Sequence, residues 1–560
     1  MSYLKFERAL VTNLEESLSR ELLRTNRSGA YSCSTIVDCN TRKYHGLLVV
    51  PVPELDNENH VLLSSLDVTV VQHGADFNLG LHRYQGNHFS PNGHKYIHAF
   101  NCDKVPTTIY RVGGVILRRE VVFQHYEDRI LIRYTLVDSH SETKLRLRPF
   151  LAFRSVKEFT HANGVANRNY QVVDGGICTC LYAGYPNLYL QFDKPNEFIY
   201  QPDWYRDIEY AKERERGYDS TEDLYVPGYF ELDIKKGESV VFSASTSEIE
   251  PATLHDLFAK EVAERTPRDN FFHCLVNAAH QFHIHEKNGD RYILAGYPWF
   301  KCRARDMFIA LPGLTLSINE RDYFELVMET AMRGLQEFMA GQPLSVKIAE
   351  IEQPDVMLWA VWCIQQYAKD AGLKACQSRY GELLHAILSF IESGHHPHLT
   401  LKENGLVYTE GHEKPMTWMN SMADGHPIVP RSGYIVEFNA LWYNALKFSA
   451  EMAAFMHDEA EEKRLDNLAM RCQQAFVSCF VNEYGYLFDY VDEGPQDWSV
   501  RPNMIFAIAL DYSPLNQQQK KSVLDVCTRE LLTPKGLRTH SPKSNGYTPL
   551  YTGPPRQRDY

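Results

Sequence analysis

Residues 115–123 read Val-Ile-Leu-Arg-Arg-Glu-Val-Val-Phe, a run in which branched apolar residues alternate with charged ones. The same two-residue period returns at 129–136 (Arg-Ile-Leu-Ile-Arg-Tyr-Thr-Leu) and at 145–151 (Leu-Arg-Leu-Arg-Pro-Phe-Leu). This period is typical of strands with one buried face. Turn signals at 113–114, 174–176 and 235–237 separate such runs. The region from about 32 to 247 is therefore predicted to form a large antiparallel sandwich.

The period changes at about residue 250. Residues 252–263 have apolar positions at helical spacing and predict a helix that follows the sandwich. Further helical segments are predicted at 271–286, 305–318, 321–338, 354–371, 376–394, 435–456, 458–480, 501–511 and 516–532. That makes about nine helices, whereas an α/α toroid closes with about twelve.

Short and long connections alternate between these predicted helices. The long aromatic and polar loops (287–304, 339–353, 395–434 and 481–500) suit helical hairpins arranged in a ring, with the loops gathered at one end to make a site. We therefore expect a multidomain β plus α protein. Residues 1–247 would form a β-supersandwich, 248–268 a helical linker, and 269–560 an incomplete (α/α)6 barrel.

Composition excludes several classes of protein. A formal net charge of −13 and an isoelectric point near 6.0 are unsuited to nucleic acid, which requires clustered Lys and Arg. No run approaches the roughly 18 apolar residues that span a bilayer, and the N-terminus has no uninterrupted apolar segment of the kind found in signal peptides. We expect a cytoplasmic protein without a membrane partner. The sequence does not report the oligomeric state.

The cysteines and histidines give little indication of a metal. The 12 cysteines are scattered through segments typical of a protein core, which predicts reduced, buried thiols. Cys178 and Cys180, His283 and His285, or the histidines at 395–398 could each bind a metal, but none has a second pair at the spacing of a zinc site. No metal and no organic cofactor is expected.

Residues 295–313 read Ala-Gly-Tyr-Pro-Trp-Phe-Lys-Cys-Arg-Ala-Arg-Asp-Met-Phe-Ile-Ala-Leu-Pro-Gly. Tyr297, Trp299 and Phe300 would offer flat apolar faces to a sugar ring, and Arg305 and Asp306 would offer hydrogen bonds to vicinal hydroxyls. The pattern therefore favours a carbohydrate pocket. Loop packing of an aromatic cluster beside proline is the alternative.

Two motifs near the N-terminus carry a resemblance to a known family. They are residues 25–35 (Thr-Asn-Arg-Ser-Gly-Ala-Tyr-Ser-Cys-Ser-Thr) and 40–49 (Asn-Thr-Arg-Lys-Tyr-His-Gly-Leu-Leu-Val). Further matches are 296–300 with Arg305 and Asp306, the helix start from Asp355 to Trp359, 417–420 (Thr-Trp-Met-Asn), 430–433 (Pro-Arg-Ser-Gly), 436–446 and 500–503 (Val-Arg-Pro-Asn). Over nearly the whole chain the sequence resembles the glycogen debranching enzymes of the amylo-α-1,6-glucosidase type, in their shorter prokaryotic form.

The resemblance implies a β-supersandwich, an (α/α)6 barrel and hydrolysis of α-1,6-linked glucose at branch points of glycogen or limit dextrin, with an α-glucan as the binding partner. A glycosidase needs a carboxylic acid that protonates the leaving oxygen and, for inversion, a carboxylate that activates water. The family's acid is expected at the end of Thr-Trp-Met-Asp, where this chain has Asn420. An amide cannot donate that proton, so Asp424 or Glu437 would have to take the role.

The substrate-binding residues implied by the pattern and the resemblance are Tyr297, Trp299, Phe300, Arg305, Asp306, Asp355, Trp359, Trp418, Arg431, Asn439 and Trp442. Glu437 could instead stabilise its helix by interacting with the helix dipole, and Asp306 and Asp355 could be helix caps. Residues 536–560 resemble the segment that leads to the family's last barrel helices, so we expect a truncated barrel whose general base is missing. The alternatives are a noncatalytic glycan-binding protein and a disaccharide phosphorylase, although no phosphate loop is visible.

Overall fold

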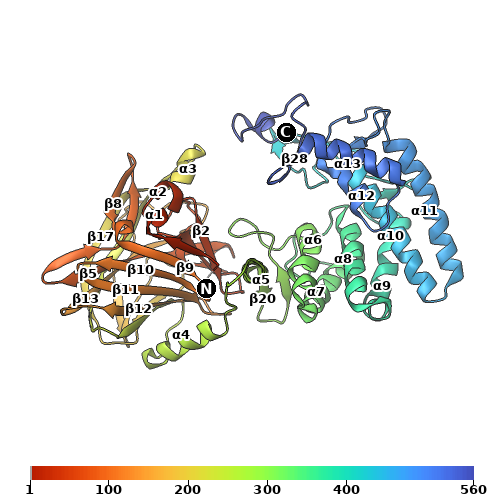
Figure 1. The fold of residues 1–560 in the computed structure, drawn as a ribbon. Helices are drawn as coiled ribbons and strands as arrows, with labels where there is room; N and C mark the ends of the chain where they lie inside the picture. Colours follow the sequence, from red (N-terminus) through yellow and green to blue (C-terminus); the bar gives the residue numbers. More distant parts are fainter. Residues whose placement is uncertain (1–2) are drawn as a thin grey trace. The chain divides into compact units, whose positions relative to one another are not determined.

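The computed structural model describes residues 3–560. The chain divides into two compact units, Met1–Gly289 and Asp290–Tyr560 (Figure 1). The expected helix in the linker exists as α4 (Leu254–Ala263), and both α4 and α5 (Phe271–Phe282) belong to the first unit. The boundary between the two compact units therefore lies after Gly289. The domain ranges expected from the sequence (1–247, 248–268 and 269–560) remain a prediction.

The first unit is the antiparallel sandwich that the sequence predicts, made of two sheets. One sheet contains, in spatial order, β1 (Lys5–Glu7), β9 (Ile97–Cys102), β10 (Pro106–Val112), β11 (Val115–Phe123), β12 (Arg129–Asp138), β19 (Ser239–Ser245), β16 (Leu188–Phe192), β15 (Gly176–Thr179) and β14 (Tyr170–Val173). The other contains β2 (Glu21–Thr25), β3 (Tyr31–Thr35), β4 (Gly46–Pro51), β5 (Asn59–Gln72), β13 (Thr143–Ser155), β18 (Thr221–Ile234), β17 (Glu197–Glu209), β7 (Leu81–Tyr84) and β8 (His88–Asn92), with β6 (Ala75–Asn78) paired to β5.

The alternating run at 115–123 forms β11, and its register shows why the period is two. Strand β11 pairs antiparallel with β10 and β12, so that Leu117 lies opposite Tyr110 on one side and Leu136 on the other. Leu117 and Val121 are buried in the core shared by both sheets. Gly113 and Gly114 both have positive φ in the β10–β11 turn, which explains the Gly-Gly signal.

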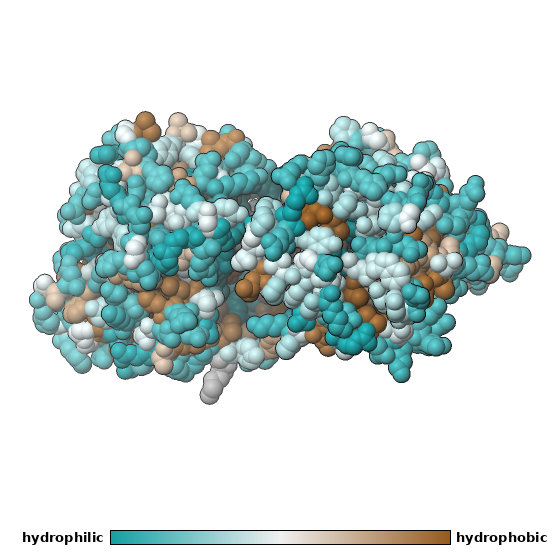
Figure 2. Space-filling view, turned by 90° about the horizontal axis from the view of Figure 1, so that it is seen from above, coloured by the Kyte–Doolittle hydropathy of each residue, from teal (hydrophilic) through white to brown (hydrophobic). Residues whose placement is uncertain are grey.

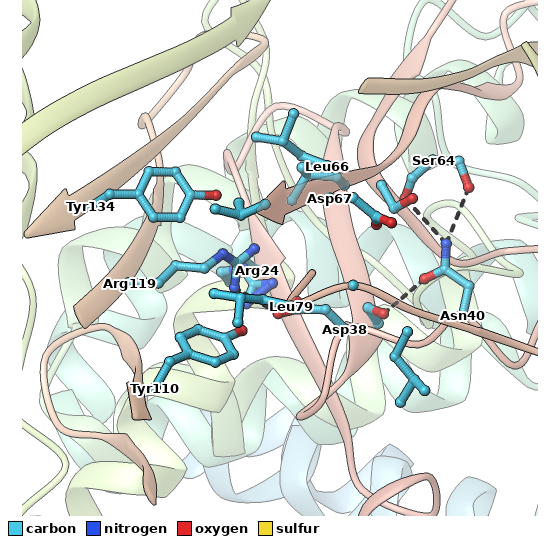
Figure 3. Close-up of a pocket in the computed structure, with 16 residues that line it drawn as sticks. Arg24, Asp38, Asn40, Ser64, Leu66, Asp67, Leu79, Tyr110, Arg119 and Tyr134 are labelled. Atoms are coloured by element: carbon cyan, nitrogen blue, oxygen red, sulfur yellow. Dashed lines mark hydrogen bonds and ion pairs between the residues drawn. The ribbon is translucent and has the colours of Figure 1, made fainter. Parts of the chain in front are cut away.

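A small polar cavity lies within this core and is lined by residues from both sheets (Figure 3). Arg119 donates from Nη1 to Asp38 Oδ2 at 2.8 Å, and Asn40 bonds Ser34 and Ser64. The cavity volume is about 30 Å³, which suits about one water molecule. It is too small for a sugar ring.

The second unit is helical, as predicted. Its main helices are α6 (Ala304–Leu314), α7 (Arg321–Met339), α8 (Val356–Ala371), α9 (Leu373–Glu392), α10 (Val436–Phe455), α11 (Glu459–Phe480), α12 (Phe506–Ala509) and α13 (Gln517–Leu531). Helix α8 packs against both α6 and α10, and α10 packs against α11 and α12. Figure 1 shows α6, α8 and α10 side by side, with α7 and α9 beside them.

Two helix expectations need correction. Residues 283–285 are extended (β20, His283–His285), so the helix expected at 271–286 ends at Phe282. The helix expected at 501–511 is instead the 3-10 turn η4 (Pro502–Ile505) followed by the single turn of α12. Pro502 fixes the start of that segment, and Pro514 shortly after it limits how far a helix can extend.

Within the described residues, no helix has the length and apolar character needed to cross a bilayer. Figure 2 shows a surface that is mostly hydrophilic, with hydrophobic side chains in separate small patches.

Candidate functional site

The predicted charged residues of the second unit gather at the N-terminal ends of α6, α8 and α10. Arg305 lies in the first turn of α6, Asp355 precedes α8, and Glu437 lies in the first turn of α10. The Arg305–Asp355 hydrogen bonds bring the starts of α6 and α8 together, and α10 packs against α8. The long connections that precede each helix bring further side chains to the same end.

The first cluster joins α6 to α8. Arg305 donates to both carboxylate oxygens of Asp355, from Nε at 2.6 Å and from Nη2 at 2.8 Å. The indole nitrogen of Trp359 donates to the same carboxylate at 3.2 Å. All three side chains are buried. A bidentate Arg–carboxylate pair fixes geometry strongly, so this cluster sets the position of the loop that begins α6.

The second cluster surrounds Arg431, whose side chain is almost fully buried. Its Nε donates to Asp489 Oδ2 at 2.8 Å, its Nη2 donates to Glu437 Oε2 at 2.7 Å, and its Nη1 bonds the other oxygen of Glu437. Burial raises the pKa of Glu437, and the Arg431 charge opposes that rise. Both oxygens of Glu437 accept from Arg431, so the buried guanidinium holds this carboxylate in place.

The segment of η4 and α12 links the two clusters. Asn503 donates to Asp489 Oδ1 at 2.7 Å and accepts from the indole nitrogen of Trp418 at 2.8 Å. Phe506 lies edge-on to Trp359, with ring centroids 5.3 Å apart. A continuous chain of contacts therefore runs from the buried Arg431 to Trp418, whose side chain is 40% exposed. The Trp418 ring is thus partly exposed, and its hydrogen bond to Asn503 holds it in place.

The aromatic loop before α6 is partly accessible. Tyr297 is buried, but Trp299 is 49% exposed and Phe300 is 44% exposed. The Arg303 guanidinium lies 4.3 Å from the centroid of the Phe300 ring, which restricts that ring. Asp306 is exposed in the first turn of α6. Trp299, Phe300 and Asp306 can therefore meet a ligand, whereas Tyr297 supports the loop from within.

Asn420 lies on an exposed stretch directly before a tight hairpin made by β24 (Met422–Ala423) and β25 (His426–Pro427). Asp424 occupies the turn of that hairpin with φ of 53° and a side chain that is 79% exposed, and it pairs with Arg556 at 3.0 Å. Asn420 and Asp424 are both exposed to solvent, and Asp424 has an arginine partner in Arg556.

Asn439 and Trp442 have packing roles. The Asn439 amide donates to the carbonyls of Val407 and Ile435 and accepts from the Val407 N–H at 2.8 Å. Trp442 is fully buried and donates to the Gly405 carbonyl at 3.2 Å. Both side chains are buried, and their polar atoms are bonded to backbone groups of the protein.

Several residues of this end were not singled out from the sequence. Asp489 and Asn503 join the Arg431 cluster. Arg501 and His540 are buried, and Arg501 Nε and Nη2 and both His540 ring nitrogens have no hydrogen-bond partner among the described residues. Burial and the charge of Arg501 lower the pKa of His540 to about 4. In the sequence, the 500–503 motif pointed to Arg501 and Asn503. No sequence motif pointed to Asp489 or His540 as a site residue.

One more carboxylate lies in the last turn of the chain. Segment α14 (Pro555–Arg558) packs against β24, next to the Asn420 stretch. Asp559 follows it, and the ring centroid of Tyr560 lies 5.3 Å from the Arg501 guanidinium carbon. Although burial raises the pKa of Asp559, bonds from Arg558 and Tyr551 lower it overall. Asp559 is therefore ionised at neutral pH beside the hairpin.

Comparison with known proteins gives a consistent assignment. The family model for the N-terminal part of glycogen debranching enzyme matches residues 20–241, and the model for amylo-α-1,6-glucosidase matches residues 276–560. A solved bacterial glucoamylase in complex with acarbose aligns over 99% of this chain and 83% of its own, with a TM-score of 0.52 and 11% identity. That likeness supports the arrangement of sandwich and helical hairpins. The chain belongs to the glycogen debranching enzymes of the amylo-α-1,6-glucosidase family and is a glycoside hydrolase.

Proposed function

We propose that this protein hydrolyses α-1,6-linked glucose at branch points of glycogen or limit dextrin, with inversion at the anomeric carbon. The observation that carries the proposal is the convergence of the Arg305–Asp355 and Arg431–Glu437–Asp489 clusters beneath exposed aromatic side chains, in the unit that matches the amylo-α-1,6-glucosidase model. The bacterial glucoamylase, which holds acarbose, supports an α-glucan as the ligand.

The proposed binding surface consists of Trp299, Phe300 and Trp418, which stack on glucose rings, and Asp306, which accepts hydrogen bonds from sugar hydroxyls. Aromatic faces and charged hydrogen-bonding groups are the usual components of a small-ligand pocket. The two buried clusters act indirectly, because they fix the loops on which these side chains lie.

Position 420 is the proposed site of the general acid, and this chain has an amide there. An amide supplies no catalytic proton, and proton donation contributes about 10² to 10⁴ in rate. In place of the base that the sequence led us to expect to be missing, we propose Asp559 as the group that activates water, since it is ionised and directly follows the segment that packs against the hairpin after Asn420. We therefore expect the chain to turn over slowly in this form.

The test is release of glucose from a phosphorylase limit dextrin by the unchanged chain, by Asn420→Asp and by Asn420→Asp with Asp559→Asn. Asn420→Asp should raise kcat by about 10² or more, and the second change should remove the gain. Proton NMR of the first product should show β-glucose. Equal rates for the unchanged chain and Asn420→Asp would contradict the role of position 420, and α-glucose would contradict inversion.

Glycan binding without turnover is the second candidate, because the Asn420 position carries no acid. Under this alternative, calorimetry would show binding of a branched dextrin by the unchanged chain, and Asn420→Asp would bind equally well but release no glucose. A Trp418→Ala variant should weaken binding in either case.

A further inference from the structure

The first unit contains a second hollow, larger than the cavity of Figure 3. It has a volume of about 170 Å³ and lies between β2, the end of β11 and the 264–281 segment. Five of its lining residues are basic: Arg24, Arg27, Lys104, Arg265 and Arg268. Glu264 is the carboxylate in the same lining. Such a concentration of positive charge is notable in a chain whose net charge is −13.

Most of these cations are held by backbone carbonyls. Lys104 Nζ donates to the Ala263 carbonyl at 3.2 Å, and Arg268 Nη1 donates to the carbonyls of Asp103 and Lys104. Arg27 Nε donates to the His280 carbonyl at 3.0 Å. A carbonyl orients a cation without cancelling its charge. Within residues 3–560, Arg27, Lys104 and Arg268 form no ion pair, so no carboxylate at salt-bridge distance neutralises their charges.

The exception is Arg265, which pairs with Glu261 at 2.9 Å at the edge of the hollow. Arg24 lines both this hollow and the inner cavity of Figure 3, and its Nε has no hydrogen-bond partner among the described residues. The charge of the lining therefore stays positive even after the nearby carboxylates are counted.

The backbone at Arg27 adds an independent observation. Arg27 has φ of 61°, a left-handed conformation that costs a residue with a side chain and that glycine adopts freely. Arg27 adopts this conformation while it lines the hollow. The backbone preference of arginine therefore does not explain why this residue type stands here.

His125 lies in the lining of the same hollow. Burial, followed by the charges of Arg265 and Arg27, lowers the pKa of this histidine to about 3. Burial is the largest cause of this shift, and the guanidinium charges of Arg265 and Arg27 add to it in the direction that a positive surrounding gives.

A metal ion is the competing occupant, because ligand atoms of His125, Glu261 and Glu264 lie within 4.8 Å of one another. However, Arg265 already bonds Glu261 and contacts His125 Nε2. A cation would have to displace that guanidinium and enter a positive field, which disfavours it.

We propose that this basic hollow, lined by Arg27, Lys104, Arg265 and Arg268, binds a small anion that carries a phosphate group. Guanidinium and ammonium groups around an enclosed space suit the several oxygens of a phosphate. The space admits a phosphate with a small organic part, and a nucleic acid would instead require a basic strip along the surface. This site is independent of the glucan site in the second unit.

The test is isothermal titration calorimetry of the full chain with inorganic phosphate and with a hexose monophosphate, and with glucose as the uncharged control. We expect saturable binding of the phosphates, none of glucose at this site, and a loss of affinity as salt rises. Thermal unfolding in the same buffers should shift upward with each binding ligand.

The variants are the double change Arg27→Gln with Lys104→Gln, the charge-keeping change Lys104→Arg, and the control Arg111→Gln, an exposed arginine on β10. The double change should weaken phosphate binding at least about tenfold, equal to about 1.4 kcal/mol, while Lys104→Arg and Arg111→Gln should keep it. Circular dichroism confirms that each variant is folded.

No saturable heat at about 10 mM of either phosphate, or equal affinity in the double variant and the parent, would overturn the proposal. So would saturable binding of Zn²⁺ or Ca²⁺ that Glu264→Gln abolishes in a chain that does not bind phosphate. If only inorganic phosphate binds, the ligand is the free ion; if the hexose monophosphate binds more tightly, it is an ester.

Discussion

At the scale of single residues, the buried Arg431 is shared by two carboxylates, Glu437 and Asp489. Removing either carboxylate should lower the free energy of unfolding. Glu437→Gln removes one charge and leaves Arg431 with Asp489 alone. Because breaking a buried ion pair costs about 3–5 kcal/mol, we expect the free energy of unfolding to fall by about 3 kcal/mol. Chemical denaturation followed by tryptophan fluorescence measures this change.

Asp424→Asn is the matched control for that experiment. Asp424 also pairs with an arginine, Arg556, but both side chains are mostly exposed. An exposed pair contributes at most about 1 kcal/mol. If both variants lost the same stability, the buried cluster would not hold the loops around Arg431 in place.

Asp128 predicts a pH dependence of the first unit. Burial, followed by repulsion from Glu127, raises the pKa of Asp128 to about 6, and Asn26 donates to it at 2.9 Å. The fold favours the protonated acid, so its stabilising contribution is complete below about pH 4 and is lost as the pH rises through about 6. A change from about 4 to about 6 corresponds to roughly 3 kcal/mol.

Asp128→Asn should remove that loss while keeping an acceptor for Asn26. Relative to the parent, the variant should gain up to about 3 kcal/mol between pH 4 and pH 8. Urea unfolding at several pH values measures it, with the exposed Asp233→Asn as control. A difference between variant and parent that does not change with pH would contradict a raised pKa for Asp128.

At the scale of elements, the Asn439 amide is one of several side chains that join α10 to the loop before it. Asn439 binds the N–H and C=O of Val407 in β23 (Val407–Tyr408), and Asn439→Ala would leave both groups unpaired inside the protein. We expect a loss of about 2–3 kcal/mol and faster hydrogen exchange at 400–409. Gln518→Ala, on the exposed face of α13, should change neither measurement.

The bounds of the helices and strands show which local sequence signals were sufficient to predict an element. The alternating run at 115–123 became β11 with the same bounds, because its period agrees with burial on one face. The helix expected at 271–286 ended at Phe282, since His283 has an extended backbone. Periodicity alone does not mark where a helix stops unless a cap or proline is present.

At the scale of the whole molecule, the cysteines provide a test of packing in both units. All 12 are free, and Cys180, Cys274 and Cys479 are those with partial exposure. Burial raises the pKa of Cys302 and Cys376 to about 12, so their reactive thiolate is rare at pH 8. With Ellman's reagent we expect at most the partly exposed thiols to react quickly, and all twelve after denaturation in guanidinium. Rapid reaction of all thiols in the native protein would contradict the burial of these cysteines.

The sequence by itself determined the sandwich, the helical part and the family, because two-residue and helical periods are local and the motifs at 40–49 and 417–420 are contiguous. It also identified Arg305, Asp355, Arg431 and Glu437. Only the tertiary structure decided their partners. Asp489 pairs with Arg431 from 58 residues away, and Asn439 and Trp442 turned inward. Partners so distant in the chain are chosen by packing, and no local pattern records which side chain will neutralise a buried charge.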